Sequence, residues 1–527
     1  MIADKVRASP IISEFTPEEI NRYFDLRKEA TESHVDSLYF CVSILNDKVV
    51  PDECPVGINL MLSKFKELRT RKTAKMSDVV SYAGLSFELT RFVHYEYCLR
   101  KAENFDIFFS SLLPNKDTPR IVVQIRTRML VLDGVCKSIC KAFRYVENIL
   151  DEFGLNVGTV FENRIDYSYH TSLIQNPYKY FSDDLLLSKL KSKMRLYHKV
   201  GEIGKSIDID YISFGQRKSN NVFVRIYNKS REVVEKNYKS FFFQKWLDQK
   251  LINEYDFYVY QKAYEMKSYV TGILVGRIDW YLEYGHNDAI KKELLRVKKS
   301  CYVNSDNVDQ LRKIVDNYLP PVTLIMNIEF QTKRKFYKSI DPWIEIYKKA
   351  YLKNGKIEGF YDTDKNPLFR LFSIYSLRSE ICNYLTTQTL SFVDNKGTKN
   401  EKLCRWWQRI NDCYIEEYDK RIIDLWRTYE RNADIEKGKR RVYKTIASLN
   451  IIQNSGYIES TFMEDVSDLL CILNDNDVSA AFVNTDTGEL FDFNPDCYQD
   501  AKIRSDRQYR SVFGKRNKDN LVKKKGS

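Results

Sequence analysis

The sequence predicts an α+β protein: a mostly antiparallel central sheet with flanking helices, then an all-α C-terminal domain and a basic, disordered tail. Strand-like and helix-like segments alternate from residue 37 to residue 285, and charged helical patterns dominate beyond residue 286. The last 26 residues hold ten Lys or Arg and only two Asp. We therefore expect an N-terminal helical extension (1–34), an α+β domain (35–295), a helical domain (296–484) and a tail (485–527).

The composition is that of a globular protein, with 43% hydrophobic and 30% charged residues. No run approaches the roughly 18 apolar residues that a membrane helix needs, and the start, MIADKVRASP, lacks the apolar core of a signal peptide. The eleven cysteines follow no paired pattern, which favours reduced thiols. We therefore expect a cytoplasmic location and no membrane partner, and the net charge of +12 permits a polyanionic partner without requiring one.

The first elements are a helix and a buried strand. Thr16 followed by Glu18 and Glu19 is typical of a helix start, because a hydroxyl and acids satisfy the free amides of the first turn. The apolar run 37–45 predicts a buried strand, whereas 60–120 is too mixed to assign.

Alternation predicts a strand from residue 119, and the next segment predicts an amphipathic helix with apolar residues three and four apart. Later elements are assigned in the same way. In chain order they are a strand at 160–171, a polar helix at 183–200, two strands within 207–229 joined by a loop at 215–221, a helix at 230–252 and a strand at 276–285. Beyond them, residues 403–429 predict one long helix, and 437–450 is either a basic DNA-facing helix or a solvated helix face.

The segment NVFVRIYNKSRE (221–232) is unusual for a strand. Alternation places Phe223, Arg225, Tyr227 and Lys229 on one face. Cations therefore lie two residues to either side of a tyrosine.

Two other predicted strands have similar faces. NRIDYSYH places Arg164, Asp166, Ser168 and His170 on one side, and GRIDWYLEY places Arg277, Asp279, Tyr281 and Glu283 on one side. Each face is either the solvated side of a sheet or one wall of a polar cleft that the strands share. A charged face that is buried needs partners in such a cleft, because unpaired buried charge costs several kcal/mol. Three such strands favour the cleft.

A cleft of this composition suits phosphodiester chemistry. Asp166, His170 and Glu283 offer oxygen and nitrogen ligands for Mg²⁺ or Mn²⁺. Arg225 and Lys229 can neutralise a developing negative charge, and Tyr227 can supply a nucleophilic oxygen. A tyrosine hydroxyl has a pKa near ~10 in model peptides, so it needs adjacent cations or a metal to react at neutral pH.

The string FGQRKSNNVFVRIYNKSRE resembles the signature of the replication initiation factor family, which comprises rolling-circle plasmid and phage initiators and related relaxases of conjugative elements. In that family a strand of the form hydrophobic-Arg-Ile-Tyr-x-Lys, followed by Glu, carries the nicking tyrosine. The pattern falls on 224–229 with Glu232 as the later acid. The upstream turn, with Gly215, Arg217 and Ser219, also resembles the family, although Gln216 replaces its serine.

The resemblance extends weakly to both other strands. NRIDYSYH resembles the family's Arg-(Leu/Ile)-Asp strand, which makes Asp166 a metal ligand, and GRIDWYLEYG resembles a later strand that ends in a glutamate, here Glu283. His170 stands where the family has a further acid, so His170 and Glu232 compete for the third ligand position.

The resemblance covers about 35–290 and implies an HUH-endonuclease-like nicking domain. Tyr227, assisted by Arg225 and Lys229, would cut one DNA strand at an origin with Mg²⁺ or Mn²⁺ and leave a 5′-phosphotyrosine and a free 3′-OH. The expected partner is origin DNA, single-stranded or hairpin-extruded, and further partners are a host helicase and a second copy of the chain. The residues expected to contact DNA are Arg164, Arg217, Ser219 and Arg277.

Three other functions fit the same residues. A conjugative relaxase would use the same chemistry with another fate for the cut strand. A DNA-binding protein without catalysis would only hold phosphates with these faces and with the basic tail. A metal-dependent nuclease would use water instead of Tyr227 as the nucleophile.

Overall fold

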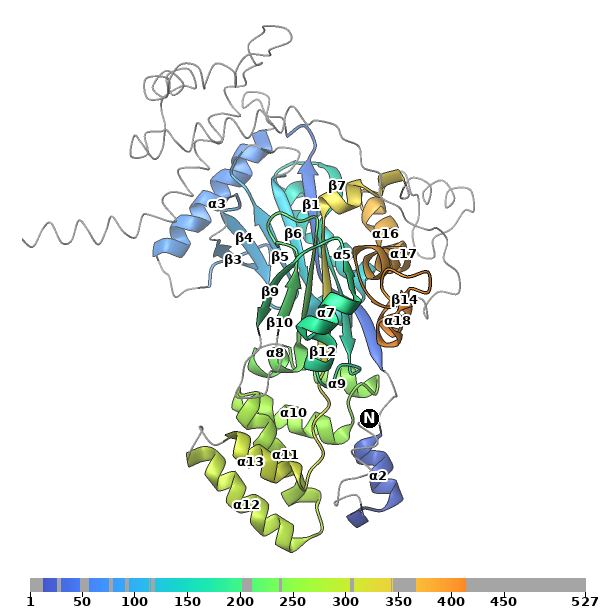
Figure 1. Ribbon diagram of the computed structural model, residues 1–527. Coiled ribbons are helices and arrows are strands. Elements are labelled where there is room, and N and C mark those ends of the chain that lie inside the picture. The colour runs from blue at the N-terminus through green and yellow to red at the C-terminus, as the bar shows by residue number, and fades with distance from the viewer. Residues whose placement is uncertain are drawn as a thin grey trace, which may run out of the picture. The chain divides into compact units, whose positions relative to one another are not determined.

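The computed structural model describes residues 13–25, 30–47, 56–74, 79–90, 94–112, 114, 119–200, 211–236, 239–303, 308–342, 344 and 366–413. This part of the chain is an α+β protein with a large, mostly antiparallel sheet and flanking helices, so the predicted fold class is confirmed (Figure 1). The predicted helix at 437–450 and the basic tail lie outside the described residues, as does 403–429 after residue 413. None of the described helices has both the length and the hydropathy needed to cross a membrane.

The chain divides into two compact units. Unit 1 comprises 1–39, 125–139 and 162–428, and unit 2 comprises 40–124, 140–161 and 429–527. Four elements contribute residues to both units: β1 (Thr31–Ile44), β6 (Ile121–Arg126), α5 (Val135–Glu152) and β7 (Val157–Thr171). Unit 2 also contains α3 (Val56–Ala74), β2 (Ser81–Tyr82), β3 (Leu85–Leu89), β4 (Tyr97–Lys101) and β5 (Phe105–Phe109), and its strands β2 to β5 pair in chain order.

Unit 1 contains the remaining elements. Within the large sheet, the strands of this unit follow the order β1-β7-β12-β11-β10-β9, and each neighbouring pair from β7 to β9 is antiparallel. The remaining elements of unit 1 are helices and strands of both sheets. In chain order they are α2 (Pro17–Phe24), α4 (Thr127–Leu132), α6 (Tyr178–Phe181), α7 (Asp183–Lys189), β8 (Leu190–Ser192), β9 (Leu196–Val200), β10 (Tyr211–Phe214), β11 (Val222–Asn228), α8 (Lys229–Glu235), α9 (Phe241–Asp248), α10 (Glu254–Met266), α11 (Val270–Tyr284), α12 (Asp288–Val303), α13 (Val308–Asp316), β12 (Met326–Lys333), α14 (Arg334–Lys338), α16 (Phe369–Ser376), α17 (Arg378–Tyr384), the π-helix η4 (Leu385–Thr389), β13 (Leu390–Asp394), β14 (Lys402–Leu403) and α18 (Arg405–Asp412).

Many predicted elements are confirmed. The capping residue Thr16 accepts a hydrogen bond from the Glu19 amide, and the Glu19 carboxylate accepts one from the Thr16 amide, so α2 begins as expected. The helix α5 and the strands β7, β10 and β11 also lie where alternation and spacing place them. The polar helix expected at 183–200 is correct only to Lys189, because β8 and β9 follow it.

The predicted strand at 276–285 is wrong, because these residues form the second half of helix α11. Buried residues surround this helix on several sides, including Leu274, Val275, Ile278 and Tyr281. A helix that is apolar nearly all round has no clear 3.6-residue pattern, so the short alternation from Ile278 to Tyr284 imitated a strand.

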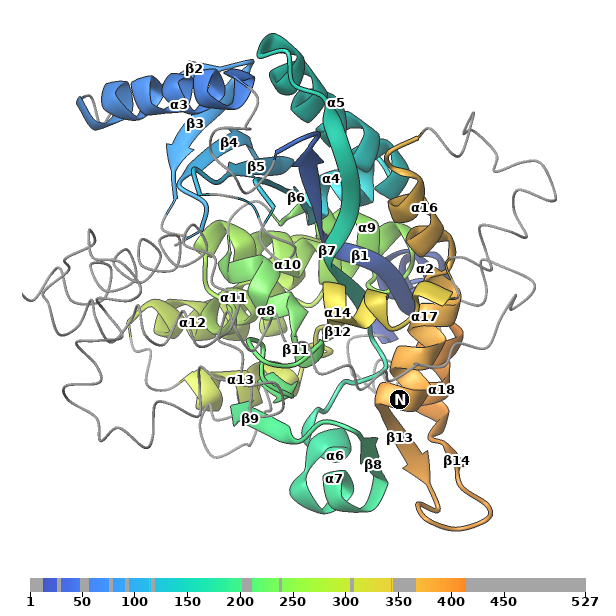
Figure 2. The same ribbon diagram turned by 90° about the horizontal axis from the view of Figure 1, so that it is seen from above.

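The expectation of an all-α region from residue 296 is also wrong. Strand β12 lies in the middle of the unit 1 sheet and pairs with β11 on one side and with β7 on the other. A second, three-stranded sheet has the order β14-β13-β8 and lies beside α18 (Figure 2).

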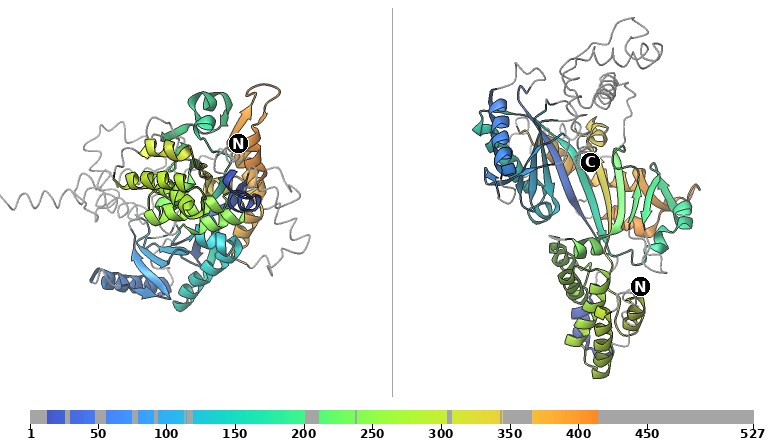
Figure 3. Two further views of the ribbon diagram at one scale, coloured as in Figure 1. Left: turned by 90° about the horizontal axis from the view of Figure 1, so that it is seen from below. Right: turned by 90° about the vertical axis from the view of Figure 1, so that its left-hand side faces the viewer.

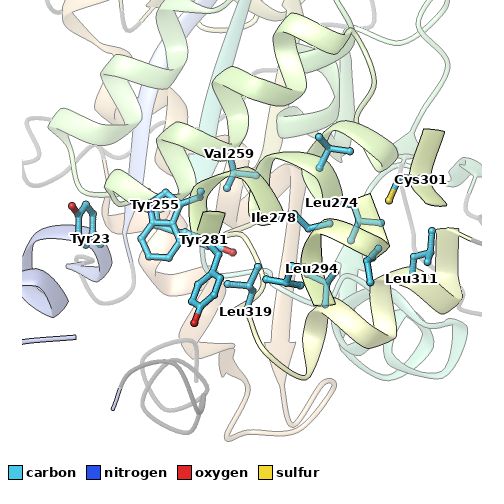
Figure 4. Packing of buried hydrophobic residues seen from close by; sticks show 14 of the residues in the cluster. Tyr23, Tyr255, Val259, Leu274, Ile278, Tyr281, Leu294, Cys301, Leu311 and Leu319 are labelled. Carbon is cyan, nitrogen blue, oxygen red and sulfur yellow. The ribbon is translucent and has the colours of Figure 1, made fainter. Parts of the chain in front are cut away.

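Helices α10 to α13 gather at one end of the unit 1 strands (right panel of Figure 3). They share an apolar core with α2, in which Tyr23 and Phe24 of α2 pack on Trp280 of α11. Figure 4 shows part of this core, with Ile278 of α11 near Leu294 of α12. Between α10 and α11 the backbones approach closely, since a Cβ on Gly272 would lie 2.7 Å from the Ala263 Cα.

We expect Gly276→Ala to destabilise the protein, although alanine favours helices. A Cβ on Gly276 would lie 2.9 Å from the carbonyl oxygen of Val259, so α10 and α11 would have to separate. Overpacking of this kind costs about 1–3 kcal/mol, whereas the same change in an exposed helix stabilises by about 0.5–1 kcal/mol. Thermal unfolding measures the difference, with Ser300→Ala on the exposed side of α12 as the control. A raised unfolding midpoint for Gly276→Ala would contradict this packing.

Candidate functional site

Four neighbouring strands of unit 1 present polar side chains on one face, which we call the polar face. Register fixes its rows, since residues opposite one another on paired strands point to the same side. The rows across β7, β12 and β11 are His170, Asn327 and Tyr227; Ser168, Glu329 and Arg225; and Asp166, Gln331 and Phe223. The faces predicted for 164–170 and 223–229 therefore do meet, and β12 joins them instead of 276–285.

Tyr227 has its hydroxyl oxygen inside a cluster of polar groups. The Asn327 side-chain amide donates to this oxygen at 2.8 Å, and the Lys229 ammonium lies 3.4 Å from it. The hydroxyl can donate to Glu329 Oε2 at 3.3 Å or to Glu232 Oε2 at 3.4 Å. Two candidate proton acceptors and two donors therefore converge on one oxygen atom.

Helix α8 supplies two of these groups because it begins directly after β11. Asn228 caps the helix by accepting from the Arg231 amide, which ends the strand and turns Lys229 and Glu232 back towards Tyr227. The fully buried Lys229 lies 2.8 Å from Glu232 Oε2 and 3.6 Å from Asp36 Oδ1. Lys229 is therefore a helix residue and not the last strand residue, yet it still contacts Tyr227 as predicted.

Arginines neutralise the buried acids of the polar face. Arg225 forms an ion pair with Glu329, which is 0% exposed. Arg164 binds both oxygens of Asp166 on the same strand. The arginine side chains stay partly exposed, at 24% for Arg225 and 18% for Arg164, so cations form part of the accessible surface of this face.

The surroundings keep Tyr227 protonated. Burial raises the Tyr227 pKa well above its usual value, and the nearby carboxylates raise it further while Lys229 opposes them. Burial disfavours a charged Lys229, but its acidic neighbours outweigh burial and hold the Lys229 pKa well above its usual range. The flanking cations therefore do not lower the Tyr227 pKa below its usual value in this arrangement, and activation of the hydroxyl would require a base or a further cation.

The acids differ in how readily they can accept a proton. Burial favours a protonated Glu232, but Lys229 and Lys239 outweigh it and hold the Glu232 pKa far below its usual range. Burial raises the Asp166 pKa to about 7, with Arg164 opposing the shift. Glu232 is therefore a persistent anion, whereas Asp166 can hold a proton near neutral pH.

The side chains of Glu32, His34 and His170 could hold a metal ion, and His170 lies in the same row as Tyr227, with Asn327 of β12 between them. One ligand atom from each lies within 4.8 Å of the others, and the Glu32 carboxylate is 2.9 Å from His170 Nδ1. Burial lowers the His34 pKa to about 3 and holds the His170 pKa well below its usual value, with other nearby cations adding to both shifts. Both rings are therefore neutral at pH 7, as metal binding requires.

The residues around this group fit a cation. His170 Nε2 is buried without a hydrogen-bond partner, and it carries a lone pair for a ligand in the tautomer whose Nδ1–H donates to Glu32. Helix α9 closes this end of the face: Trp246 Nε1 lies 3.0 Å from His170 Nδ1, and the Lys245 ammonium lies 3.0 Å from Glu32 Oε2. The ammonium of Lys245 thus neutralises Glu32 in the conformation described.

Of the four metal ligands predicted from sequence, only His170 belongs to this group. Asp166 is bound to Arg164, and Glu232 is bound to lysines. Glu283 lies on α11, exposed, where Tyr258 donates to it at 2.8 Å. Its assignment rested on a strand that does not exist.

The residues predicted to contact DNA are divided between helix α11 and the turn between β10 and β11. Arg277 is buried on α11, where it binds Asp316 and the carbonyl oxygen of Leu319, so it is a structural residue of the helical group. Arg217 and Ser219 are exposed in the turn between β10 and β11.

Sequence reasoning missed Glu32, His34, Asn327 and Glu329. The first two alternate with Asp36 on the first half of β1, a segment assigned to the N-terminal extension. The other two alternate within MNIEFQTK, whose intervening Ile328 and Phe330 are the signal that could have identified strand β12.

No protein-family model matches the chain, and no curated protein matches it. Among solved structures, the rolling circle replication initiator protein from Geobacillus stearothermophilus aligns with a TM-score of 0.31 and 11% sequence identity, over 73% of this chain and 97% of that one. A likeness at this level does not indicate a function.

We expect Mn²⁺ to raise the unfolding temperature, because an ion that binds only the folded state stabilises it by about 2.7 kcal/mol at a hundredfold excess over its Kd. His170→Gln and Glu32→Gln should abolish the shift. Glu283→Gln, a carboxylate change of the same kind on α11, should keep it. Thermal unfolding with and without a chelator measures the effect, and a shift that depends on Glu283 but not on His170 would refute this ligand set.

Proposed function

We propose that this protein is a DNA nickase and strand transferase that starts rolling-circle replication through a covalent bond between Tyr227 and DNA. One observation carries the proposal: the Tyr227 oxygen lies among a lysine, an asparagine amide and two carboxylates, beside Glu32, His34 and His170. The resemblance of 215–232 to replication initiation factors supports DNA as the substrate.

In the proposed reaction, the Tyr227 oxygen attacks a phosphodiester. The new bond joins this oxygen to phosphorus, and the bond between phosphorus and the 3′ oxygen breaks. The Tyr227 proton passes to Glu329, which is the better acceptor because three lysines surround Glu232. The departing 3′ oxygen takes up a proton from water and becomes the primer end.

Cations and amides of the polar face stabilise the charge that develops. Lys229 lies next to the attacking oxygen and so favours its anionic form. Arg225 lies on the row next to Tyr227 with its side chain partly exposed, which suits it to a phosphate oxygen. Asn327 fixes the direction of the Tyr227 hydroxyl by donating to it.

The residues that would hold a metal are Glu32, His34 and His170. A divalent cation bound there would supply Lewis-acid polarisation of the phosphate. Two imidazoles and one carboxylate suit Mn²⁺ better than Mg²⁺, which prefers oxygen ligands. Mn²⁺ is therefore the proposed cofactor, with Mg²⁺ as the weaker alternative.

The proposed substrate is origin DNA, single-stranded or extruded as a hairpin, with unwinding left to a host helicase. A conjugative relaxase would use the same residues for the same cleavage and differ in the fate of the cut strand. A protein that only binds DNA would have no use for a tyrosine hydroxyl set between two carboxylates.

Replacing Tyr227 by Phe should abolish the covalent protein–DNA product, because only the nucleophilic oxygen is lost. The assay incubates the protein and Mn²⁺ with supercoiled DNA that carries its gene and flanking sequence, and detects nicked circles with protein attached. Tyr211→Phe is the matched control, since Tyr211 lies opposite Tyr227 on β10. An adduct that survives Tyr227→Phe but not Tyr211→Phe would move the nucleophile to the other strand.

Replacing Glu329 by Gln should slow nicking about 10²–10⁴-fold, the usual contribution of a general base, with little change in DNA affinity. Glu232→Gln should slow it less, because Glu232 is held as an anion by its lysines. Single-turnover nicking rates compare the two variants. A larger loss in Glu232→Gln would assign the base to α8 instead of β12.

A further inference from the structure

A second group of cations lies at the far end of the polar face. Lys333 is the last residue of β12 and stands opposite Arg164 on β7. Its ammonium donates to the carbonyl oxygens of Arg217 and Lys218 in the turn between β10 and β11, the second at 3.2 Å. Two strands and one turn thus bring three cations together: Arg164, Arg217 and Lys333.

These cations are not fully neutralised. Arg164 binds Asp166, but neither Lys333 nor Arg217 forms an ion pair with any described residue. Partial burial lowers the pKa of Lys333, and its neighbours Arg164 and Arg217 lower it further. Repulsion of this kind is relieved when an anion binds.

The turn that carries Arg217 is built to hold one shape. Gly215 adopts φ +75°, a conformation that suits glycine. The Asn220 side chain then accepts from the Gln216 amide at 2.8 Å, and Ser219 donates to the Gln216 side chain at 3.0 Å. Arg217 therefore projects to solvent from a defined turn.

An aromatic ring adjoins the cations. The Arg164 guanidinium lies 5.0 Å from the ring centroid of Tyr39 on β1. The Tyr39 side chain is half-buried on the strand next to β7. Aromatic rings beside cations are the usual platform for unpaired bases, which stack on them.

We propose that Arg164, Arg217, Lys333 and Tyr39 form a second binding site for single-stranded DNA, so that the substrate strand runs along β7 and β12 to Tyr227. This inference rests on the proposed function and gives it a direction. Lys333 is six residues from Asn327, which is about 20 Å along a strand. At the ~3.4 Å rise of stacked nucleotides, this distance spans about six nucleotides.

The chemistry favours a single strand over a duplex. Between the two ends lies the partly exposed side chain of Arg225, which is paired with the buried Glu329. A flexible strand can run from the second group of cations past Arg225, bring one phosphate to the half-buried Tyr227 and place a base on Tyr39. A duplex would hold its bases away from that ring.

The test is DNA binding by the Tyr227→Phe variant without divalent metal, which removes any need for nicking. Fluorescence anisotropy compares oligothymidylates of about four and about twelve nucleotides with a duplex. Arg217→Ala and Lys333→Gln should each weaken binding of the longer oligomer and lower its salt slope by ~0.7. They should change the affinity for the shorter oligomer by less than about twofold, because about four stacked nucleotides do not span the ~20 Å between the two sites. Lys338→Ala, an exposed lysine on α14, should change neither.

Substitutions of Tyr39 test the aromatic part of the second site independently of its cations. Tyr39→Leu should weaken binding of the longer oligomer at least about fivefold, which is the low end for loss of one stacked base. Tyr39→Phe should bind this oligomer with normal affinity. Circular dichroism and unfolding curves verify that each variant is folded. Equal losses for both oligomer lengths, equal losses for the duplex, or no loss in folded Arg217→Ala and Lys333→Gln would each overturn the second site. A failure of Tyr227 to form an adduct would overturn only the proposed function.

Discussion

The pairing of buried charges on one face of a sheet is the constraint on which the rest of this structure depends. Glu329 and Lys229 are both inaccessible to solvent, and an unpartnered charge in such a place would cost several kcal/mol. Glu329 therefore needs Arg225, and Lys229 needs the acids Asp36 and Glu232. These pairs hold β1, β11, β12 and α8 in one arrangement, and Tyr227 lies at the point where they meet.

The same pairing determines the resting state of Tyr227. The acids that neutralise Lys229 and Arg225 also disfavour a phenolate, so the hydroxyl stays protonated until something changes the local charge. A DNA phosphate would draw Arg225 away from Glu329 and so free Glu329 to accept the proton. In this account, substrate binding and activation of the nucleophile are one event, and the protein avoids carrying a reactive tyrosine in the absence of DNA.

Sequence reasoning found the half of the polar face whose strands have strong local signals. Strand β11 alternates cleanly and begins after the turn at 215–221, and β7 has apolar residues on its other face. Strand β12 was missed because its Asn, Glu, Gln and Lys side chains look like a solvated face, and only the neighbouring strands make them buried. Helix α11 was mistaken for a strand because a helix that is buried on most sides lacks the 3.6-residue alternation of apolar and polar residues. Glu32 and His34 are far from His170 in sequence, and only the pairing of β1 with β7 brings them together.

The most direct test of the central claim is to locate the covalent bond to DNA. After nicking, nuclease digestion would leave a few nucleotides on the protein, and mass spectrometry of its peptides would identify the modified residue. We predict a nucleotide phosphate on the peptide that contains Tyr227, with fragmentation placing it on that side chain. Nicked DNA with no nucleotide on any tyrosine would contradict the account and would indicate water as the nucleophile.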